Sequence, residues 1–121
     1  MQILIVEDED LAVRKLQKML SLIEPRLNIA GVTDSIVSTV AWLKSNPVPD
    51  LIFMDIELSD GQSFEIFRRV QIDSPVVFTT SYDESSIKAF DLGSKHYLLK
   101  PIQKDELENI VRKFFHPVSD T

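Results

Sequence analysis

Apolar residues gather into four short runs along the chain, and within each run they are consecutive instead of alternating with polar residues. Continuous runs of this length are typical of strands that are covered on both faces of a parallel sheet. A fifth segment, Leu27–Val32, alternates more and predicts an edge strand. The four continuous runs are Ile3–Val6, Leu51–Met54, Val76–Phe78 and Tyr97–Leu99.

Between the strand-like runs, the spacing of apolar residues changes to the period of an amphipathic helix. A β-α unit is thereby repeated, which predicts a doubly wound α/β sandwich with helices on both faces of a parallel sheet. A capping box at Ser81 and Glu84 is expected to open the helix that follows them. The helical stripes are Ala12, Leu16, Met19, Leu20 and Ile23; Ile36, Val40 and Leu43; Phe64, Phe67 and Val70; Ile87 and Phe90; and Leu107, Ile110, Val111 and Phe114.

Composition limits the chain to one domain and disfavours some classes of binding partner. Its 121 residues, 44% of them hydrophobic, suffice for one core that buries roughly two-thirds of the unfolded surface. The net charge of −6 disfavours direct binding to nucleic acid or an anionic membrane and suits a divalent cation. The absence of cysteine excludes disulfides and thiolate metal sites. With no signal peptide and no run of about 18 apolar residues, a cytoplasmic location is expected.

Polar and charged residues follow the apolar runs directly. In a doubly wound sheet, ligands bind beyond the carboxyl ends of the strands, so these residues are expected to converge on one edge. They are Glu7 and Asp8 after the first run, Asp55 after the second, Thr79, Thr80 and Ser81 after the third, and Lys100 after the last.

Carboxylates that share a site raise one another's pKa and destabilise the fold unless a cation lies among them. Mg²⁺ is the expected cation because it prefers oxygen ligands and tolerates retained waters, whereas zinc favours histidine and cysteine. A lysine and a hydroxyl at the same edge suit a phosphoryl group. A carboxylate can act as the nucleophile, which would give an aspartyl phosphate.

Each of these residues also has an ordinary structural explanation. The acidic residues after the first run could stabilise a helix N-terminus, an effect of about 0.3–1 kcal/mol, and Lys100 could be a solvated lysine. Their joint occurrence with Asp55 favours the functional interpretation. Tyr97 is as consistent with plain packing as with a functional role. Structural or exposed roles are expected for His96, His116 and Trp42.

Five motifs in order along the chain resemble the receiver domain of two-component response regulators, from residue 1 to about residue 115. The resemblance implies a flavodoxin-like fold with strand order 2-1-3-4-5. The chain looks most similar to receivers of the LytTR (LytR/AlgR) type, which precede a DNA-binding domain. The motifs are ILIVEDE at 3–9, FMDIEL at 53–58, DG at 60–61, FTTSYDE at 78–84 and YLLKP at 97–101.

The resemblance implies a phosphoacceptor and a metal site. Asp55 would accept phosphate from the phosphohistidine of a sensor histidine kinase. Asp8 and Asp55 would bind Mg²⁺ directly, with the backbone carbonyl of Glu57 as a third protein ligand. Glu7 would act on the metal mainly through water.

Further residues of the motifs match the switch of the family. Thr80, preferred to Thr79 because it lies further toward the strand end, corresponds to the hydroxyl that follows the phosphoryl group. Tyr97 corresponds to the aromatic residue that swings inward with it. Lys100 would pair with the phosphoryl oxygens, and the Lys100–Pro101 peptide bond is expected to be cis.

The chain departs from the family pattern after Asp55. Most receivers carry proline where Ser59 stands, so the loop is expected to be more mobile here. Glu57 and Tyr82 occupy positions that in the family tune how fast the phosphoryl group is lost. Asp60 and Gly61 are interpreted as turn residues.

The main hypothesis is therefore a phosphorylation-activated receiver that catalyses its own phosphotransfer and slow autodephosphorylation, and is otherwise not an enzyme. Its output face would be the fourth helix, fifth strand and fifth helix, which could form a homodimer. Residues 116–121 are expected to begin a linker to a missing effector domain that binds DNA and regulates transcription. The alternatives are a stand-alone single-domain receiver, a phosphatase of the haloacid-dehalogenase kind, and a receiver-like module that never accepts phosphate.

Overall fold

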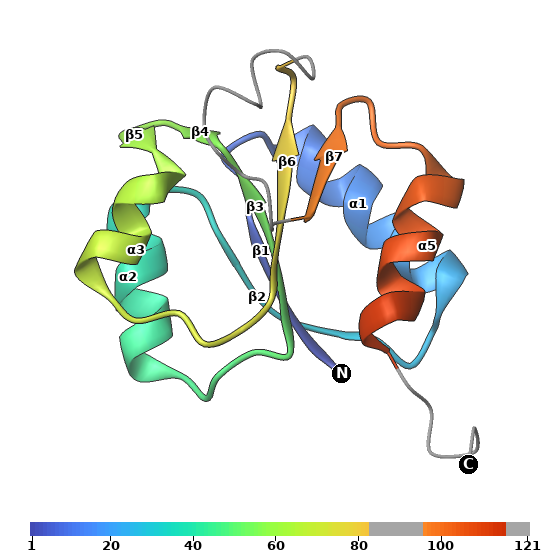
Figure 1. The fold of residues 1–121 in the computed structure, drawn as a ribbon, viewed down its shortest axis with the longest axis horizontal. Coiled ribbons are helices and arrows are strands. Elements are labelled where there is room, and N and C mark those ends of the chain that lie inside the picture. Colours follow the sequence, from blue (N-terminus) through green and yellow to red (C-terminus); the bar gives the residue numbers. More distant parts are fainter. Residues whose placement is uncertain (83–95, 116–121) are drawn as a thin grey trace.

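A parallel sheet of five strands forms the centre of the molecule, as Figure 1 shows. The computed structural model describes residues 1–82 and 96–115. The strands lie in the order β2-β1-β3-β6-β7, which is the predicted order 2-1-3-4-5 counted over the long strands. Their bounds are β1 Gln2–Val6, β2 Asn28–Thr33, β3 Leu51–Asp55, β6 Val76–Thr80 and β7 His96–Leu99.

Helices cover both faces of the sheet, which confirms the doubly wound sandwich. On one face lie α1 (Asp10–Ile23) and α5 (Lys104–Phe114). On the other lie α2 (Ile36–Ser45) and a short helical segment, in which a 3-10 turn, η1 (Ser63–Glu65), leads into α3 (Ile66–Arg69). The predicted stripe of Ile87 and Phe90, the Glu84 half of the capping box, and the tail 116–121 lie outside the described residues.

Two apolar clusters, one on each side of the sheet, explain why the strand runs are continuous. Successive side chains of a strand point to opposite faces. Ile3 and Ile5 of β1 therefore join the cluster under α1 and α5, whereas Leu4 and Val6 join the cluster under α2 and α3. Because both faces are covered, both sets of side chains are buried. The carboxyl ends of β1, β3 and β6 thus extend from strands whose side chains are buried on both faces of the sheet.

The edge strand β2 alternates between more and less exposed residues, as its sequence indicated. Trp42 of α2 packs over this strand, and a Cβ atom built on Gly31 would lie 2.4 Å from the indole Nε1. Glycine at this position therefore allows the indole to approach the backbone of β2. The structural role expected for Trp42 is confirmed.

A small antiparallel hairpin after β3 was not predicted. It consists of β4 (Glu57–Leu58) and β5 (Gly61–Gln62), with Ser59 and Asp60 as its two-residue turn. Gly61 has φ +136°, a conformation that residues with a Cβ atom rarely adopt. Strands of two residues leave no detectable period in the sequence, so the sequence indicates only a turn at this segment.

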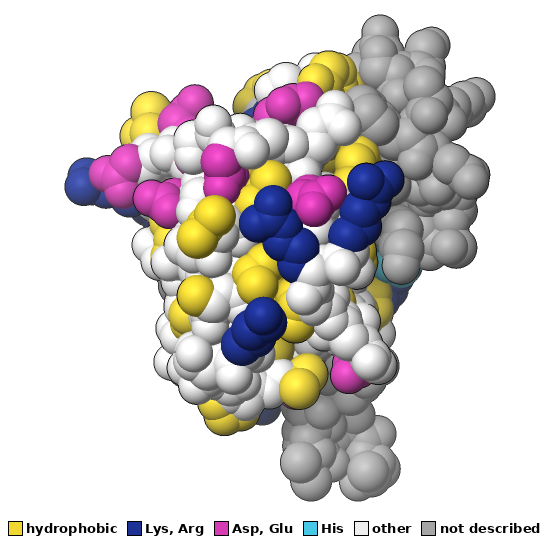
Figure 2. Space-filling view, turned by 90° about the vertical axis from the view of Figure 1, so that its left-hand side faces the viewer, with side chains coloured by type: hydrophobic (Ala, Val, Ile, Leu, Met, Phe, Trp, Pro, Cys, Tyr) yellow, Lys and Arg dark blue, Asp and Glu magenta, His cyan; other side chains and the backbone are white. Residues whose placement is uncertain are grey.

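Acidic side chains gather on the upper part of the face formed by α2 and α3, as Figure 2 shows. The upper end of this view is the end at which the strands of Figure 1 terminate.

In the part of the chain that the structure describes, no helix is both long and apolar enough to cross a bilayer.

Candidate functional site

The residues that follow the strands converge on one pocket at the edge of the sheet. The parallel register places Asp55 of β3 opposite Thr79 of β6, and Thr80 opposite Leu99 of β7. The strand ends are therefore level with one another. The pocket has a volume of about 410 Å³ and is lined by Glu7, Asp8, Glu9, Asp55, Glu57, Thr80, Ser81, Tyr82 and Lys100.

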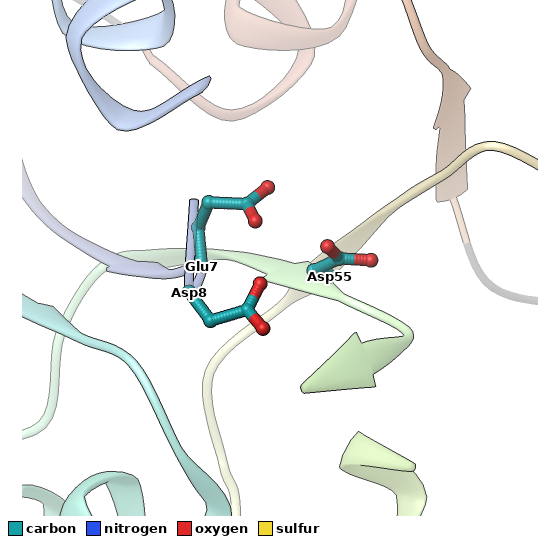
Figure 3. A group of neighbouring side chains, drawn as sticks. All are labelled: Glu7, Asp8 and Asp55. Atoms are coloured by element: carbon teal, nitrogen blue, oxygen red, sulfur yellow. The ribbon is translucent and has the colours of Figure 1, made fainter. Parts of the chain in front are cut away.

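Three carboxylates form the acidic part of this pocket. Glu7 and Asp8 follow β1 and Asp55 ends β3, and their nearest oxygen atoms all lie within 4.8 Å of one another (Figure 3). Glu7 and Asp55 are buried, with only 6% and 8% of their surface exposed, whereas Asp8 is exposed. Uncompensated negative charges at this spacing oppose folding, so the cluster favours a bound cation.

Lys100 partly compensates the charge of the two buried acids. Its Nζ donates to Glu7 Oε1 at 2.6 Å and to Asp55 Oδ2 at 3.0 Å. Burial lowers the pKa of Lys100, but the hydrogen bonds to Glu7 and Asp55 outweigh it, so the pKa is raised overall. The ammonium group therefore stays charged at neutral pH and faces both carboxylates.

Glu7 holds its proton unusually tightly. Burial raises the pKa of its carboxyl from 4.5 to about 7; the charge of Asp55 adds to this rise, and the hydrogen bond from Lys100 offsets part of it. Its second oxygen accepts the backbone N–H of Glu9 at 3.1 Å. Glu7 is thus half ionised near neutral pH when no cation is bound.

The structure distinguishes the two threonines at the end of β6. Neighbouring residues of a strand face opposite sides, and Thr80 lines the acidic pocket whereas Thr79 lines an adjoining hollow beside α1. The hydroxyl of Thr80 accepts the backbone N–H of Tyr82 at 3.0 Å. Thr80 is therefore the hydroxyl that faces the acidic cluster.

Tyr82 and Glu57 both line the pocket and contact each other, a contact that sequence reasoning missed. The phenol of Tyr82 donates to Glu57 Oε1 at 2.5 Å, and Gln62 Nε2 donates to the same oxygen at 3.3 Å. The hydrogen bond to Glu57 raises the pKa of Tyr82, so the phenol remains a donor. The sequence indicates a role for each residue, but 25 positions separate them and no local pattern signals the pair.

The remaining candidates do not line this pocket in the part of the chain that the structure describes. Tyr97 is partly buried and packs against the apolar cluster under α2 and α3. The Lys100–Pro101 peptide bond is cis. The ring of His96 packs edge-on against Phe114 with centroids 5.2 Å apart, which is a structural role. His116 lies outside the described residues.

The donor set fits a hard divalent cation such as Mg²⁺. The described lining of the pocket offers carboxylate, hydroxyl and backbone oxygens, and it includes neither histidine nor cysteine. A carboxylate, an amine and a hydroxyl also surround the space where a phosphoryl group would lie. The pocket can therefore combine a carboxylate nucleophile with two positive groups, a lysine and a metal ion.

Comparisons with known proteins identify the family to which the chain is similar. The family profile described as "Response regulator receiver domain" matches residues 3–112. The chain is 32% identical over 116 residues to the "Sensory transduction protein LytT" of Enterococcus faecalis, covering 93% of this chain and 47% of that protein. It is 31% identical over 116 residues to the "Transcriptional regulatory protein LytR" of Staphylococcus aureus, covering 93% of this chain and 46% of that protein.

A solved structure shares the fold over nearly the full length of both chains. The response regulatory domain of protein mrkE from Klebsiella pneumoniae superimposes with a TM-score of 0.78 at 28% identity, covering 94% of each chain. By contrast, the chain spans about half the length of the two curated relatives.

Proposed function

The chain belongs to the response regulator receiver domain family, and from this premise we propose that Asp55 accepts a phosphoryl group from a sensor histidine kinase. The observation that carries the proposal is the placement of Asp55 at a strand end, 3.0 Å from Lys100 and within the acidic cluster. A buried strand holds the nucleophile, and an adjacent lysine suits the negative phosphoryl oxygens.

The proposed transfer is a single displacement at phosphorus. An oxygen of the Asp55 carboxylate attacks the phosphorus atom, the phosphorus–nitrogen bond of the kinase phosphohistidine breaks, and the electron pair leaves with the imidazole nitrogen. Lys100 then turns from the carboxylates to the phosphoryl oxygens. The product is an acyl phosphate on Asp55, with a histidine that regains its proton from solvent.

Asp8, Asp55 and the backbone carbonyl of Glu57 would hold Mg²⁺, with Glu7 acting through water. When bound, the ion supplies neutralisation of charge on the phosphoryl group. The oxygen-only donor set described above supports this assignment.

Phosphorylation would be read out by Thr80 and Tyr97. The Thr80 hydroxyl faces the pocket, and Tyr97 lies on the neighbouring strand β7 beside Phe78. Movement of both side chains would change the face that includes β7 and α5, on which a homodimer could form. In a longer protein, this change would control a DNA-binding domain and so transcription in the cytoplasm; the name of the S. aureus relative supports such an output.

The test is phosphorylation by acetyl phosphate in the presence of Mg²⁺. We expect one acid-labile phosphoryl group per chain, located at Asp55 by borohydride reduction and peptide mass spectrometry, and no labelling when EDTA removes the metal. Failure to gain phosphate, or turnover of the phosphomonoester p-nitrophenyl phosphate as by a phosphatase, would contradict the proposal.

Replacing Tyr82 by alanine is expected to shorten the lifetime of the phosphorylated protein by about threefold to tenfold. The ring lines the pocket and hydrogen-bonds to Glu57, and its removal is expected to admit water to the acyl phosphate. Loss of labelled phosphate after rapid removal of the donor measures this rate. Tyr82→Phe, which keeps the ring without the hydroxyl, serves as the matched control. An unchanged or longer lifetime in Tyr82→Ala would show that the ring does not shield the site.

A further inference from the structure

A carboxylate from the β4–β5 hairpin caps the distant helix α2. Asp60 Oδ1 accepts the backbone N–H of Ile36 at 2.8 Å, and Oδ2 accepts that of Val37 at 3.2 Å. The two partners of the first bond are 24 positions apart in the sequence. These hydrogen bonds lower the pKa of Asp60, so its carboxylate is charged at neutral pH. The tip of the hairpin is therefore tied to the positive end of a helix.

The backbone N–H groups in the first turn of α2 donate to acceptors from two different segments of the chain. Ser35 and Ser38 form a capping box, in which Ser38 N–H donates to Ser35 Oγ at 3.0 Å and Ser35 N–H donates to Ser38 Oγ at 3.1 Å. The two N–H groups between them are those that Asp60 accepts. Local residues already start the helix, so the contact with Asp60 adds a connection between two segments that a local cap would not provide.

The underside of the same hairpin is held by apolar packing and by one backbone bond. Ile56 and Leu58 are buried in the cluster that contains Ile36. The N–H of Ser63 donates to the Ile56 carbonyl at 2.8 Å, which closes the base of the hairpin. Between the base and the tip lies Glu57, whose backbone carbonyl is the proposed third metal ligand. The Glu57 N–H donates to Asp55 Oδ1 at 3.2 Å, so the position of Glu57 relative to Asp55 depends on this local bond together with both attachments of the hairpin.

We propose that Asp60 is a positioning residue for the metal site: by tying the hairpin tip to the N-terminus of α2, it holds the Glu57 carbonyl beside Asp55. The inference rests on the proposed function and deepens it. It also revises the expectation that Ser59, in place of proline, loosens this loop. The Ser59 hydroxyl lies 3.5 Å from the Asp34 carbonyl, next to the same helix end. Connection to α2 would supply the order that a proline supplies elsewhere.

The test compares Asp60→Ala with Ser35→Ala, because both remove caps from α2 but only the first releases the hairpin. Both variants are expected to lower the melting temperature by a few degrees. Asp60→Ala alone is expected to weaken Mg²⁺ binding by about tenfold in a calorimetric titration. It should also accelerate hydrogen exchange of the Ser63 amide in metal-free protein. Asp60→Asn, which keeps one acceptor oxygen, should restore part of the Mg²⁺ affinity.

Two results would overturn the proposal. If Asp60→Ala bound Mg²⁺ with wild-type affinity and its Ser63 amide exchanged at the wild-type rate, Asp60 would be only a helix cap. If Ser35→Ala weakened Mg²⁺ binding as much as Asp60→Ala, the effect would come from the stability of α2. If the wild-type protein bound no Mg²⁺ and accepted no phosphate, the proposed function would fail, and with it the role of Asp60 toward the metal. The exchange of the Ser63 amide would still decide whether Asp60 holds the hairpin.

Discussion

Replacing Asp55 by asparagine is expected to abolish phosphorylation by acetyl phosphate, a loss of at least about a thousandfold in rate. The amide oxygen of asparagine is a far weaker nucleophile than a carboxylate oxygen, yet it can still accept the hydrogen bond that Lys100 donates at 3.0 Å. The variant therefore keeps the geometry of the site but lacks the nucleophile. Incorporation of labelled phosphate into purified variant and wild-type protein measures the effect.

The matched control is Asp8→Asn, which removes one carboxylate from the cluster but keeps the nucleophile. It should lower the affinity for Mg²⁺, and phosphorylation should recover partly at high Mg²⁺ concentration. Asp55→Asn should not recover at any Mg²⁺ concentration. Labelling of Asp55→Asn at the wild-type rate would show that another residue accepts the phosphoryl group.

The affinity for Mg²⁺ is expected to fall by up to about tenfold per pH unit below pH 7. The pKa of Glu7 in the metal-free site is about 7, mainly through burial, with a further contribution from Asp55. Below that pH the carboxyl is protonated, so the cation must displace a proton to gain the charge of Glu7. Calorimetric titrations at several pH values, with Glu7→Gln as the control, measure the slope; the control should be flatter. Equal slopes in both proteins would assign the pH dependence to other groups.

The same shift makes the metal-free fold lose stability as pH rises. The pKa of Glu7 is raised from 4.5 in the reference state to about 7, so its contribution is fully present below pH 4.5 and is lost by about pH 7. The shift corresponds to about 3 kcal/mol of unfolding free energy at order-of-magnitude precision. Saturating Mg²⁺ should restore stability by mass action. Urea unfolding measures the free energy of unfolding of the wild type and of Glu7→Gln. The difference between the two values should show this loss between pH 4.5 and 7. A difference independent of pH would contradict the raised pKa.

Much of the architecture follows from local patterns. The run Leu51–Met54 is apolar at every position because β3 is covered on both faces, so its sequence was enough to predict a buried parallel strand. The edge strand β2 was recognised by its alternation. The placement of Asp55, Asp8 and Lys100 at one edge followed from strand direction alone, because parallel strands end at the same side of a sheet.

The sequence by itself thus determined the fold class and the residue types at the carboxyl ends of the strands, since these depend on period and direction, whereas the order of the strands was implied by the resemblance of its motifs to receiver domains. Only the tertiary structure decided that Tyr82 meets Glu57 and that Asp60 caps α2. These contacts depend on a two-residue hairpin turn and on side chains that meet 24 or 25 positions apart. Such geometry leaves no periodic trace in the chain, because it is set by how separate elements pack and not by any one of them.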